Sequence, residues 1–228
     1  MSWWNKNKWK VVIPLLILAV LACAFWFGGN APGTRGLESD EPSSTPSADA
    51  SETPTMEIDP QTGKDAYLTD PVPEGMPLPV EPQDAVISDT AYTCTISISC
   101  ATILDNLSLC DPAKVDLVPQ DGWILKPVTV TFYEGESVFN LLRRVCKQNR
   151  IHMEFEDTPI YNSAYIEGIH NLYEFDVGEL SGWMYSVNGW FPYYGCSRYR
   201  LNDGDVVCWV YTCDLGNDVG GGYANGNK

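Results

Sequence analysis

The sequence predicts an α+β fold for its C-terminal half, and three observations indicate this class. Residues 93–101 alternate strictly between apolar and polar side chains, which is the pattern of a half-buried strand. Residues 137–149 repeat apolar side chains at helical spacing, as an amphipathic helix does. Residues 182–187 are followed by Asn188-Gly189, a pair that suits both positive-φ positions of a type I′ hairpin turn.

The other elements follow in chain order. Glu134-Gly135 turns the chain, Ser137 caps the helix, and the basic residues near the helix end favour its dipole. Strands are predicted at residues 93–101, 128–133, 152–155, 164–169, 182–187 and 206–212. One helix packed on a mixed or antiparallel sheet is most simply a β-grasp-like domain.

The N-terminus predicts a membrane anchor. Residues 1–10 contain three lysines and no acid, and residues 11–29 contain no charged or amide side chain. Nineteen helical residues rise about 28 Å, close to the thickness of a hydrocarbon core. We therefore expect a single-pass signal-anchor helix. Because basic residues that flank such a helix remain on the cytoplasmic side, residues 1–10 should form a cytoplasmic tail and the bulk of the chain should lie outside the cell membrane.

Two alternatives remain for this apolar stretch. A cleaved secretory signal normally has a shorter apolar core and ends in small residues, whereas this one ends in Phe-Trp-Phe. Residues 20–23 resemble a lipobox, which would make Cys23 a lipidation site. All three interpretations place residues 30–228 outside the cytoplasm.

Residues 30–92 are predicted to be a disordered, extended spacer. They hold 13 acidic and two basic residues among many prolines, serines and threonines. Residues 93–213 form the predicted extracellular domain, and residues 214–228 a flexible, Gly-rich tail. The whole chain has a formal charge of −16, so nucleic acid is excluded as a partner.

Seven cysteines follow the apolar stretch, and outside the cytoplasm disulfides are the default. An odd number leaves at least one thiol free or paired between chains. Cys94 and Cys100 lie about 20 Å apart on one strand face, too far to bridge each other. The disulfide candidates are Cys94, Cys100, Cys110, Cys146, Cys196, Cys208 and Cys213.

The sequence lacks the motifs of known catalytic and metal chemistry. It has no G-x-S-x-G elbow, Walker loop, G-x-G-x-x-G, H-E-x-x-H or calcium loop, and no C-x2-C pair for zinc. We therefore expect a non-catalytic protein with no metal and no cofactor.

Residues 181–199 concentrate aromatic side chains. One interpretation is a hydrophobic core with an aromatic loop; the other is an exposed aromatic platform for a flat ligand or a partner. On the second interpretation the candidate ligand-binding residues are Trp183, Tyr185, Trp190 and Tyr193.

Four pieces of sequence together resemble the transcobalamin-like C-terminal domain family, a group largely of unknown function found on many bacterial surface proteins. The pieces are residues 133–142 (YEGESVFNLL), 165–169 (YIEGI), 181–189 (SGWMYSVNG) and 203–205 (DGD). The resemblance covers about residues 93–213 and implies a β-grasp-like fold. By analogy with cobalamin carriers it also implies corrinoid contacts from Trp183, Tyr185 and Tyr165.

Two functions are expected from these observations. The first is a membrane-anchored extracellular binding module for a corrinoid or another small ligand, acting as an accessory to an uptake transporter; cobalamin would be a ligand and not a cofactor. The alternative is a structural or adhesive cell-surface protein that makes protein–protein contacts. A concave aromatic site favours the first, and a flat exposed aromatic patch favours the second.

Overall fold

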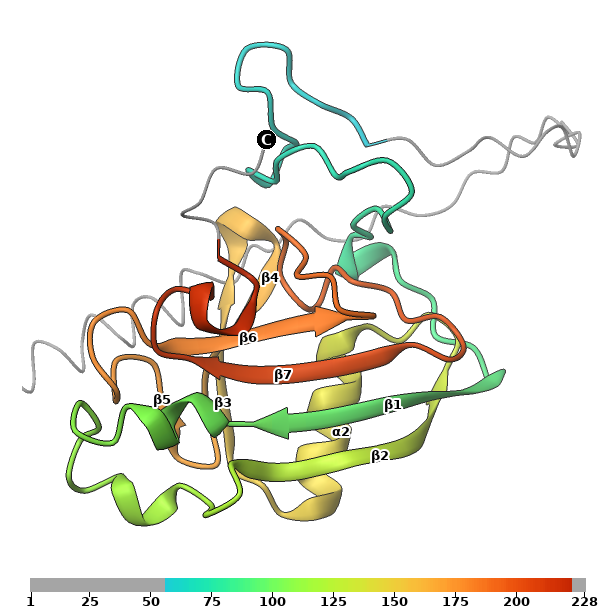
Figure 1. Ribbon diagram of the computed structural model, residues 1–228. Coiled ribbons are helices and arrows are strands. Elements are labelled where there is room, and N and C mark those ends of the chain that lie inside the picture. The colour runs from blue at the N-terminus through green and yellow to red at the C-terminus, as the bar shows by residue number, and fades with distance from the viewer. Residues whose placement is uncertain (1–55, 223–228) are drawn as a thin grey trace, which may run out of the picture. The chain divides into compact units, whose positions relative to one another are not determined.

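The computed structural model describes residues 56–222, and its central element is a four-stranded mixed sheet of order β2-β1-β7-β6 (Figure 1). β1 pairs antiparallel with β2 and parallel with β7, and β6 pairs antiparallel with β7. The strands are β1 (Ala91–Ser99), β2 (Trp123–Tyr133), β6 (Gly182–Val187) and β7 (Val206–Thr212). The two central strands therefore come from opposite ends of the domain.

A single α-helix, α2 (Val138–Asn149), follows β2. It begins with a capping box: Ser137 Oγ accepts a hydrogen bond from the Asn140 backbone N–H (3.2 Å), and Asn140 Oδ1 accepts one from the Ser137 N–H (3.0 Å). It ends at Arg150, whose φ of 57° is left-handed. The predicted helix is confirmed at both ends.

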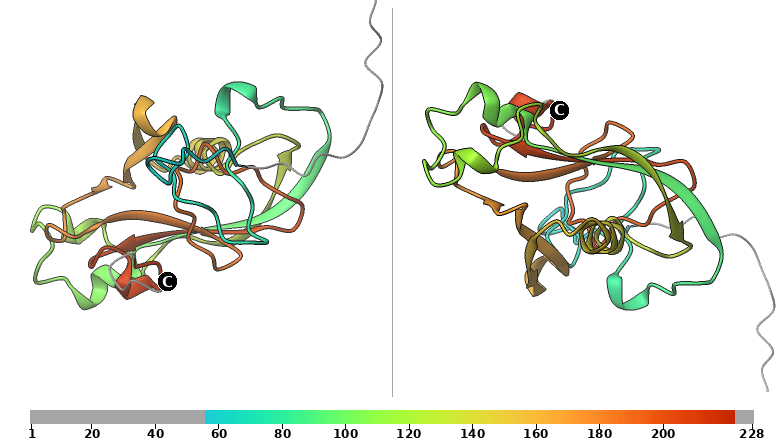
Figure 2. Two further views of the ribbon diagram at one scale, coloured as in Figure 1. Left: turned by 90° about the horizontal axis from the view of Figure 1, so that it is seen from above. Right: turned by 90° about the horizontal axis from the view of Figure 1, so that it is seen from below.

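The hydrophobic core lies between α2 and one face of the four-stranded sheet. Seen nearly end-on in Figure 2, the helix lies across that face. Leu141, Leu142 and Val145 of the helix are fully buried, and so are Ile96 of β1 and Phe132 of β2. The apolar positions of the alternating strand and of the one-faced helix meet in this layer, which confirms the α+β class.

A second sheet of order β3-β4-β5 follows the helix and is entirely antiparallel. Its strands are β3 (Met153–Thr158), β4 (Ser163–Ile169) and β5 (Leu172–Tyr173). β4 also packs beside β6, so the edge of the larger sheet adjoins the smaller one. This junction positions the candidate site.

A smaller apolar cluster lies at the C-terminal ends of β1 and β7. Residues 100–122, which include the 3-10 helices η2 (Ala101–Asp105) and η3 (Val115–Leu117), cover it. Its buried members are Cys100, Ile103, Cys110, Leu172, Val177 and Tyr211.

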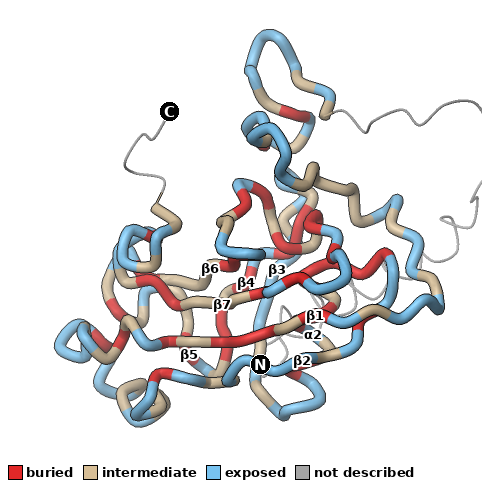
Figure 3. The backbone as a smooth tube through the Cα atoms, turned by 45° about the vertical axis from the view of Figure 1, so that its right-hand side comes forward, coloured by how far each residue is buried: buried red, intermediate tan, exposed pale blue. Residues whose placement is uncertain are grey.

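Residues 56–90 differ from the predicted spacer, because they pack on the domain. Val80 N–H donates to the Arg198 carbonyl (2.8 Å), Ser88 N–H donates to the Glu134 carbonyl (3.0 Å), and the segment includes η1 (Pro82–Asp84). Figure 3 shows buried positions within it. A high density of acids predicts disorder only while the acids are solvated, and here a buried arginine pairs two of them.

The predicted flexible tail also differs where it is described. Residues 214–222 turn back on β7 through η5 (Asn217–Val219): Gly216 N–H donates to Thr212 Oγ1 (2.7 Å), and Cys213 N–H donates to the Asp218 carboxylate (2.7 Å).

The predicted anchor at residues 11–29 and the alternative lipidation site Cys23 lie outside the described residues. Within residues 56–222, no helix combines the length and apolarity needed to cross a bilayer.

Candidate functional site

Two hollows open next to each other where β4 passes β6, and Tyr165 lines both. The first has a volume of about 420 Å³ and adjoins residues 67–69; we call it the Tyr193 hollow. The second has a volume of about 580 Å³ and extends along β6; we call it the Trp183 hollow. The Tyr193 hollow includes Tyr67, Leu68, Tyr161, Tyr165, Tyr193 and Tyr194, and the Trp183 hollow includes Tyr165, Glu174, Phe175, Glu179, Leu180 and Trp183.

Tyr165 points outward because its neighbours in β4, Ala164 and Ile166, are buried in the core. Its side chain is 48% exposed, and its hydroxyl donates a hydrogen bond to the Glu174 carboxylate. Partial burial raises the pKa of this hydroxyl above its ordinary value, and the Glu174 carboxylate raises it further. Tyr165 is thus a neutral ring fixed between the two hollows.

Trp183 lies in β6 and is half-buried. Its indole Nε1–H donates to the Leu172 carbonyl (2.8 Å), and its ring meets that of Tyr211 edge-to-face, with centroids 5.2 Å apart. These two contacts fix the ring, which lines the Trp183 hollow.

Tyr193 is 41% exposed and lines the Tyr193 hollow. Its ring lies edge-to-face against Trp190 at 6.2 Å, but Trp190 itself packs against the stacked rings of Tyr194 and Tyr199. Trp190 therefore supports the wall from behind and does not line either hollow.

Tyr185 is placed in the core. It is buried, its hydroxyl donates to the Tyr194 carbonyl (2.8 Å), and its ring packs on Trp209 at 5.6 Å. It lines neither of the two hollows. Within residues 181–199, Tyr185 thus belongs to the core, whereas Trp183 and Tyr193 line the hollows.

Some residues that line the hollows were not predicted from the sequence. Phe175, Leu180 and Leu215 are 62%, 46% and 54% exposed and surround the Trp183 hollow. Phe175 has a φ of 67°, which is unusual for a residue with a bulky side chain. The only signal for these residues in the sequence was that a large apolar side chain stands close to a glycine, at Gly178 or Gly216, where a turn is expected.

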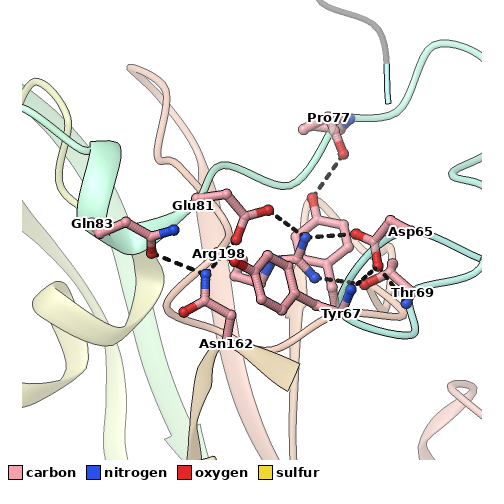
Figure 4. Close-up of polar contacts among 9 residues, drawn as sticks. Asp65, Tyr67, Thr69, Pro77, Glu81, Gln83, Asn162 and Arg198 are labelled. Atoms are coloured by element: carbon pink, nitrogen blue, oxygen red, sulfur yellow. Dashed lines mark hydrogen bonds and ion pairs between the residues drawn. The ribbon is translucent and has the colours of Figure 1, made fainter. Parts of the chain in front are cut away.

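Arg198 lines the Tyr193 hollow and is 1% exposed, and Figure 4 shows its polar contacts. Its Nη2 donates to Asp65 Oδ2 (2.7 Å) and to Glu81 Oε1 (2.6 Å), and its Nη1 donates to Thr69 Oγ1 (2.6 Å). The guanidinium also lies 5.0 Å from the centre of the Tyr67 ring. The segment that completes this hollow is therefore fixed by one buried cation.

Asp65 is stabilised as an anion in this cluster. Its partial burial opposes ionisation, but the hydrogen bond from Arg198 and those from the Thr69 and Tyr67 backbone outweigh it and lower the pKa below its ordinary value of 3.8.

The seven candidate cysteines are all free thiols, so the structure contains none of the predicted disulfides within residues 56–222. Burial raises the pKa of Cys94 and Cys213 to about 11 and that of Cys100, Cys146 and Cys196 to about 12. Cys100, Cys110 and Cys213 meet in the smaller apolar cluster, a proximity that strand spacing alone could not reveal.

Another hollow, of about 440 Å³, lies between residues 80–87 and the N-terminus of α2. Asn140 lines it, but its side chain is already engaged in the capping box. Within the described part of the chain, no group of three or more His, Cys, Asp or Glu side chains could hold a metal ion.

Fold and site together define an α+β domain in which one helix backs a mixed sheet and aromatic side chains line hollows at the sheet edge. Residues 135–213 match the family model described as "Domain of unknown function (DUF4430)", and this confirms the predicted family resemblance for that part of the chain. β1 and the whole of β2 precede the matched residues, although they complete the sheet.

Two solved structures are similar at low identity. A crystal structure of haptocorrin in complex with Cbi is 15% identical with a TM-score of 0.40, covering 56% of this chain and 26% of that chain. A putative metal binding protein from Ruminococcus gnavus ATCC 29149 is 11% identical with a TM-score of 0.32, covering 53% of this chain and 96% of that chain. No curated protein matches the chain.

Proposed function

We propose that this chain is a non-catalytic binding module, held at the outer face of the cell membrane by residues 11–29, whose aromatic hollows take a small flat ligand. A corrinoid is the first ligand to test, because the sequence resembles the C-terminal domain of cobalamin carriers. In this role the protein delivers the ligand to an uptake transporter. We also propose that the arrangement of one helix on a mixed sheet is β-grasp-like.

The observation that carries the proposal is the pair of adjoining hollows that share Tyr165. Ligand sites are concave and mostly apolar, with a few polar groups that fix orientation. Here the rings of Tyr165, Trp183 and Tyr193 supply flat apolar area, and hydroxyl and carboxylate groups surround them. Rigid aromatic side chains lose little conformational entropy on binding, which favours a flat partner.

The experiment is calorimetry of the full chain, purified in maltoside detergent, against a panel of corrinoids up to high micromolar concentration. Tyr165→Ala should weaken binding at least about tenfold, because it removes the ring that both hollows share. Tyr133→Ala is the matched control: Tyr133 is also 41% exposed but lines neither the Tyr193 nor the Trp183 hollow. No heat with any corrinoid would remove the corrinoid from the proposal.

A second candidate function is adhesion through protein–protein contacts, and exposed apolar side chains favour it. Ile160 and Tyr161 are 59% and 52% exposed beside the Tyr193 hollow. Cross-linking on intact cells should then capture a surface protein, and the double variant Ile160→Ser, Tyr161→Ser should abolish capture. Retention of capture by that variant would remove adhesion by this surface.

A further inference from the structure

The Trp183 hollow differs from the Tyr193 hollow in its charge. Two of its lining side chains are the carboxylates Glu174 and Glu179, and none of its lining residues is Lys, Arg or His. The Tyr193 hollow, in contrast, has Arg198 in its wall and no carboxylate. The whole chain carries a formal charge of −16, so the surrounding field has the same sign as these carboxylates.

Three aromatic side chains line the same hollow, each from a different element. Tyr165 comes from β4, Phe175 from the loop after β5, and Trp183 from β6. The faces of aromatic rings carry negative electrostatic potential, and they attract cations within about 6 Å.

The aromatic walls are fixed before any ligand arrives. The Trp183 indole donates to the Leu172 carbonyl (2.8 Å), and the Tyr165 hydroxyl donates to Glu174. Glu174 is half-buried, and its carboxylate accepts that bond. A preformed site needs little ordering when it binds, which improves affinity.

We propose that the Trp183 hollow is a binding site for the quaternary or alkylated ammonium group of a small organic cation. The inference rests on the proposed function of the hollow as a ligand site, and it names the charge of the ligand. The rings contact the methyl groups of the cation, and Glu174 and Glu179 balance its charge. An anion is disfavoured here by both carboxylates, and an uncharged apolar group gains nothing from them.

The test is calorimetry of the full chain in maltoside detergent, which has no ammonium group of its own. The two probes are choline and 3,3-dimethylbutan-1-ol, which has the same shape but no charge. Choline should bind at least about tenfold more tightly than its uncharged analogue. Equal affinity for the two probes, or no binding of choline at millimolar concentration, would overturn the proposal.

Two variants locate the site. Phe175→Leu keeps an apolar side chain but removes a ring from a position that is 62% exposed, and Glu179→Gln removes one exposed charge. Each should weaken choline binding about fivefold or more and leave the thermal midpoint unchanged. The matched control is Glu156→Gln, an exposed carboxylate on β3 that lines none of the three hollows described above. If Glu156→Gln weakened choline binding as much as Glu179→Gln, the charge would act at long range and the site would be refuted.

The corrinoid and choline titrations test the two proposals independently. Charge-dependent choline binding without corrinoid binding supports the cation site and removes the corrinoid. Corrinoid binding that is weakened by Tyr165→Ala, with no preference for choline over its analogue, keeps the proposed function and overturns the cation site.

Discussion

Arg198 is the residue that keeps the segment of residues 56–90 on the domain. Its guanidinium is 1% exposed and joins Asp65, Thr69 and Glu81 of that segment to the loop before β7. A buried cation with two carboxylate partners is costly to leave unpaired, so the three side chains stabilise one arrangement of the segment.

Stability should therefore decline at acid pH through Asp65. Because the folded state lowers the pKa of Asp65 below 3.8, its stabilising contribution is complete above about pH 4 and is lost as the pH falls through the lower, folded-state pKa. Asp65→Asn should cost about 2 kcal/mol at pH 7 and flatten the dependence of unfolding free energy on pH below 4.

Urea unfolding of both proteins between pH 2.5 and 7 measures this effect. Asp70→Asn is the control, since Asp70 pairs with Lys64 at a surface where both side chains are well exposed (2.8 Å). If Asp65→Asn and Asp70→Asn changed the profile equally, the Arg198 cluster would not be its source.

At the scale of elements, the turn between β2 and α2 lies directly against residues 86–87 of the segment 56–90. Gly135 has a φ of 89°, and a Cβ built there would lie 2.1 Å from the Val86 carbonyl oxygen. Only glycine allows both this backbone conformation and this approach.

Gly135→Ala should consequently destabilise the protein by more than Gly189→Ala does. Gly189 also has a positive φ, of 82°, but nothing lies within 4 Å of a Cβ built there, so its substitution costs about 1 to 2 kcal/mol of backbone strain alone. Thermal unfolding gives the difference, and limited proteolysis of residues 56–90 should accelerate only in Gly135→Ala. Equal unfolding free energies would show that the contact with Val86 contributes nothing.

The helix and six strands could be predicted because each carries its own local signal. The apolar stripe with Ser137 gives α2, strict alternation gives β1, and Asn188-Gly189 adopts the positive φ values of 54° and 82° that a type I′ turn requires. β5 has only two residues and therefore no periodicity to read.

The packing of residues 56–90 and part of the candidate site depend on contacts between residues far apart in the sequence. Local sequence patterns do not predict such contacts. Arg198 and Asp65 are 133 positions apart, so composition alone assigned residues 56–90 to a spacer. Trp183 and Tyr193 were predicted from the density of aromatic side chains in residues 181–199, and Tyr165 from the family resemblance. Phe175 and Leu180 lie in a loop without any repeat.

At the scale of the whole molecule, the described thiols are protected by burial. The pKa values of Cys94, Cys100, Cys146, Cys196 and Cys213 lie at about 11 to 12. A thiol reacts through its thiolate, so little of each reactive form exists at pH 8. Four of these five thiols are buried, whereas Cys213 and also Cys208 are partly exposed.

Iodoacetamide at pH 8 should therefore modify Cys208 first in the reduced native protein, Cys213 more slowly because its pKa is raised to about 11, and the four buried thiols only after denaturation. Peptide mass spectrometry at increasing times checks this order. Modification of Cys100 and Cys213 as fast as Cys208 would show that the smaller apolar cluster opens readily.

The parallel pairing of β1 with β7 sets the order in which the domain can assemble. Thr95 lies opposite Val206, so the centre of the sheet cannot form until β7 has been made, more than 100 residues after β1. Contacts between such distant positions form slowly, because a long loop must close first. Until β7 is available, a nascent chain would therefore leave the edge of β1 unpaired and open to proteases and chaperones.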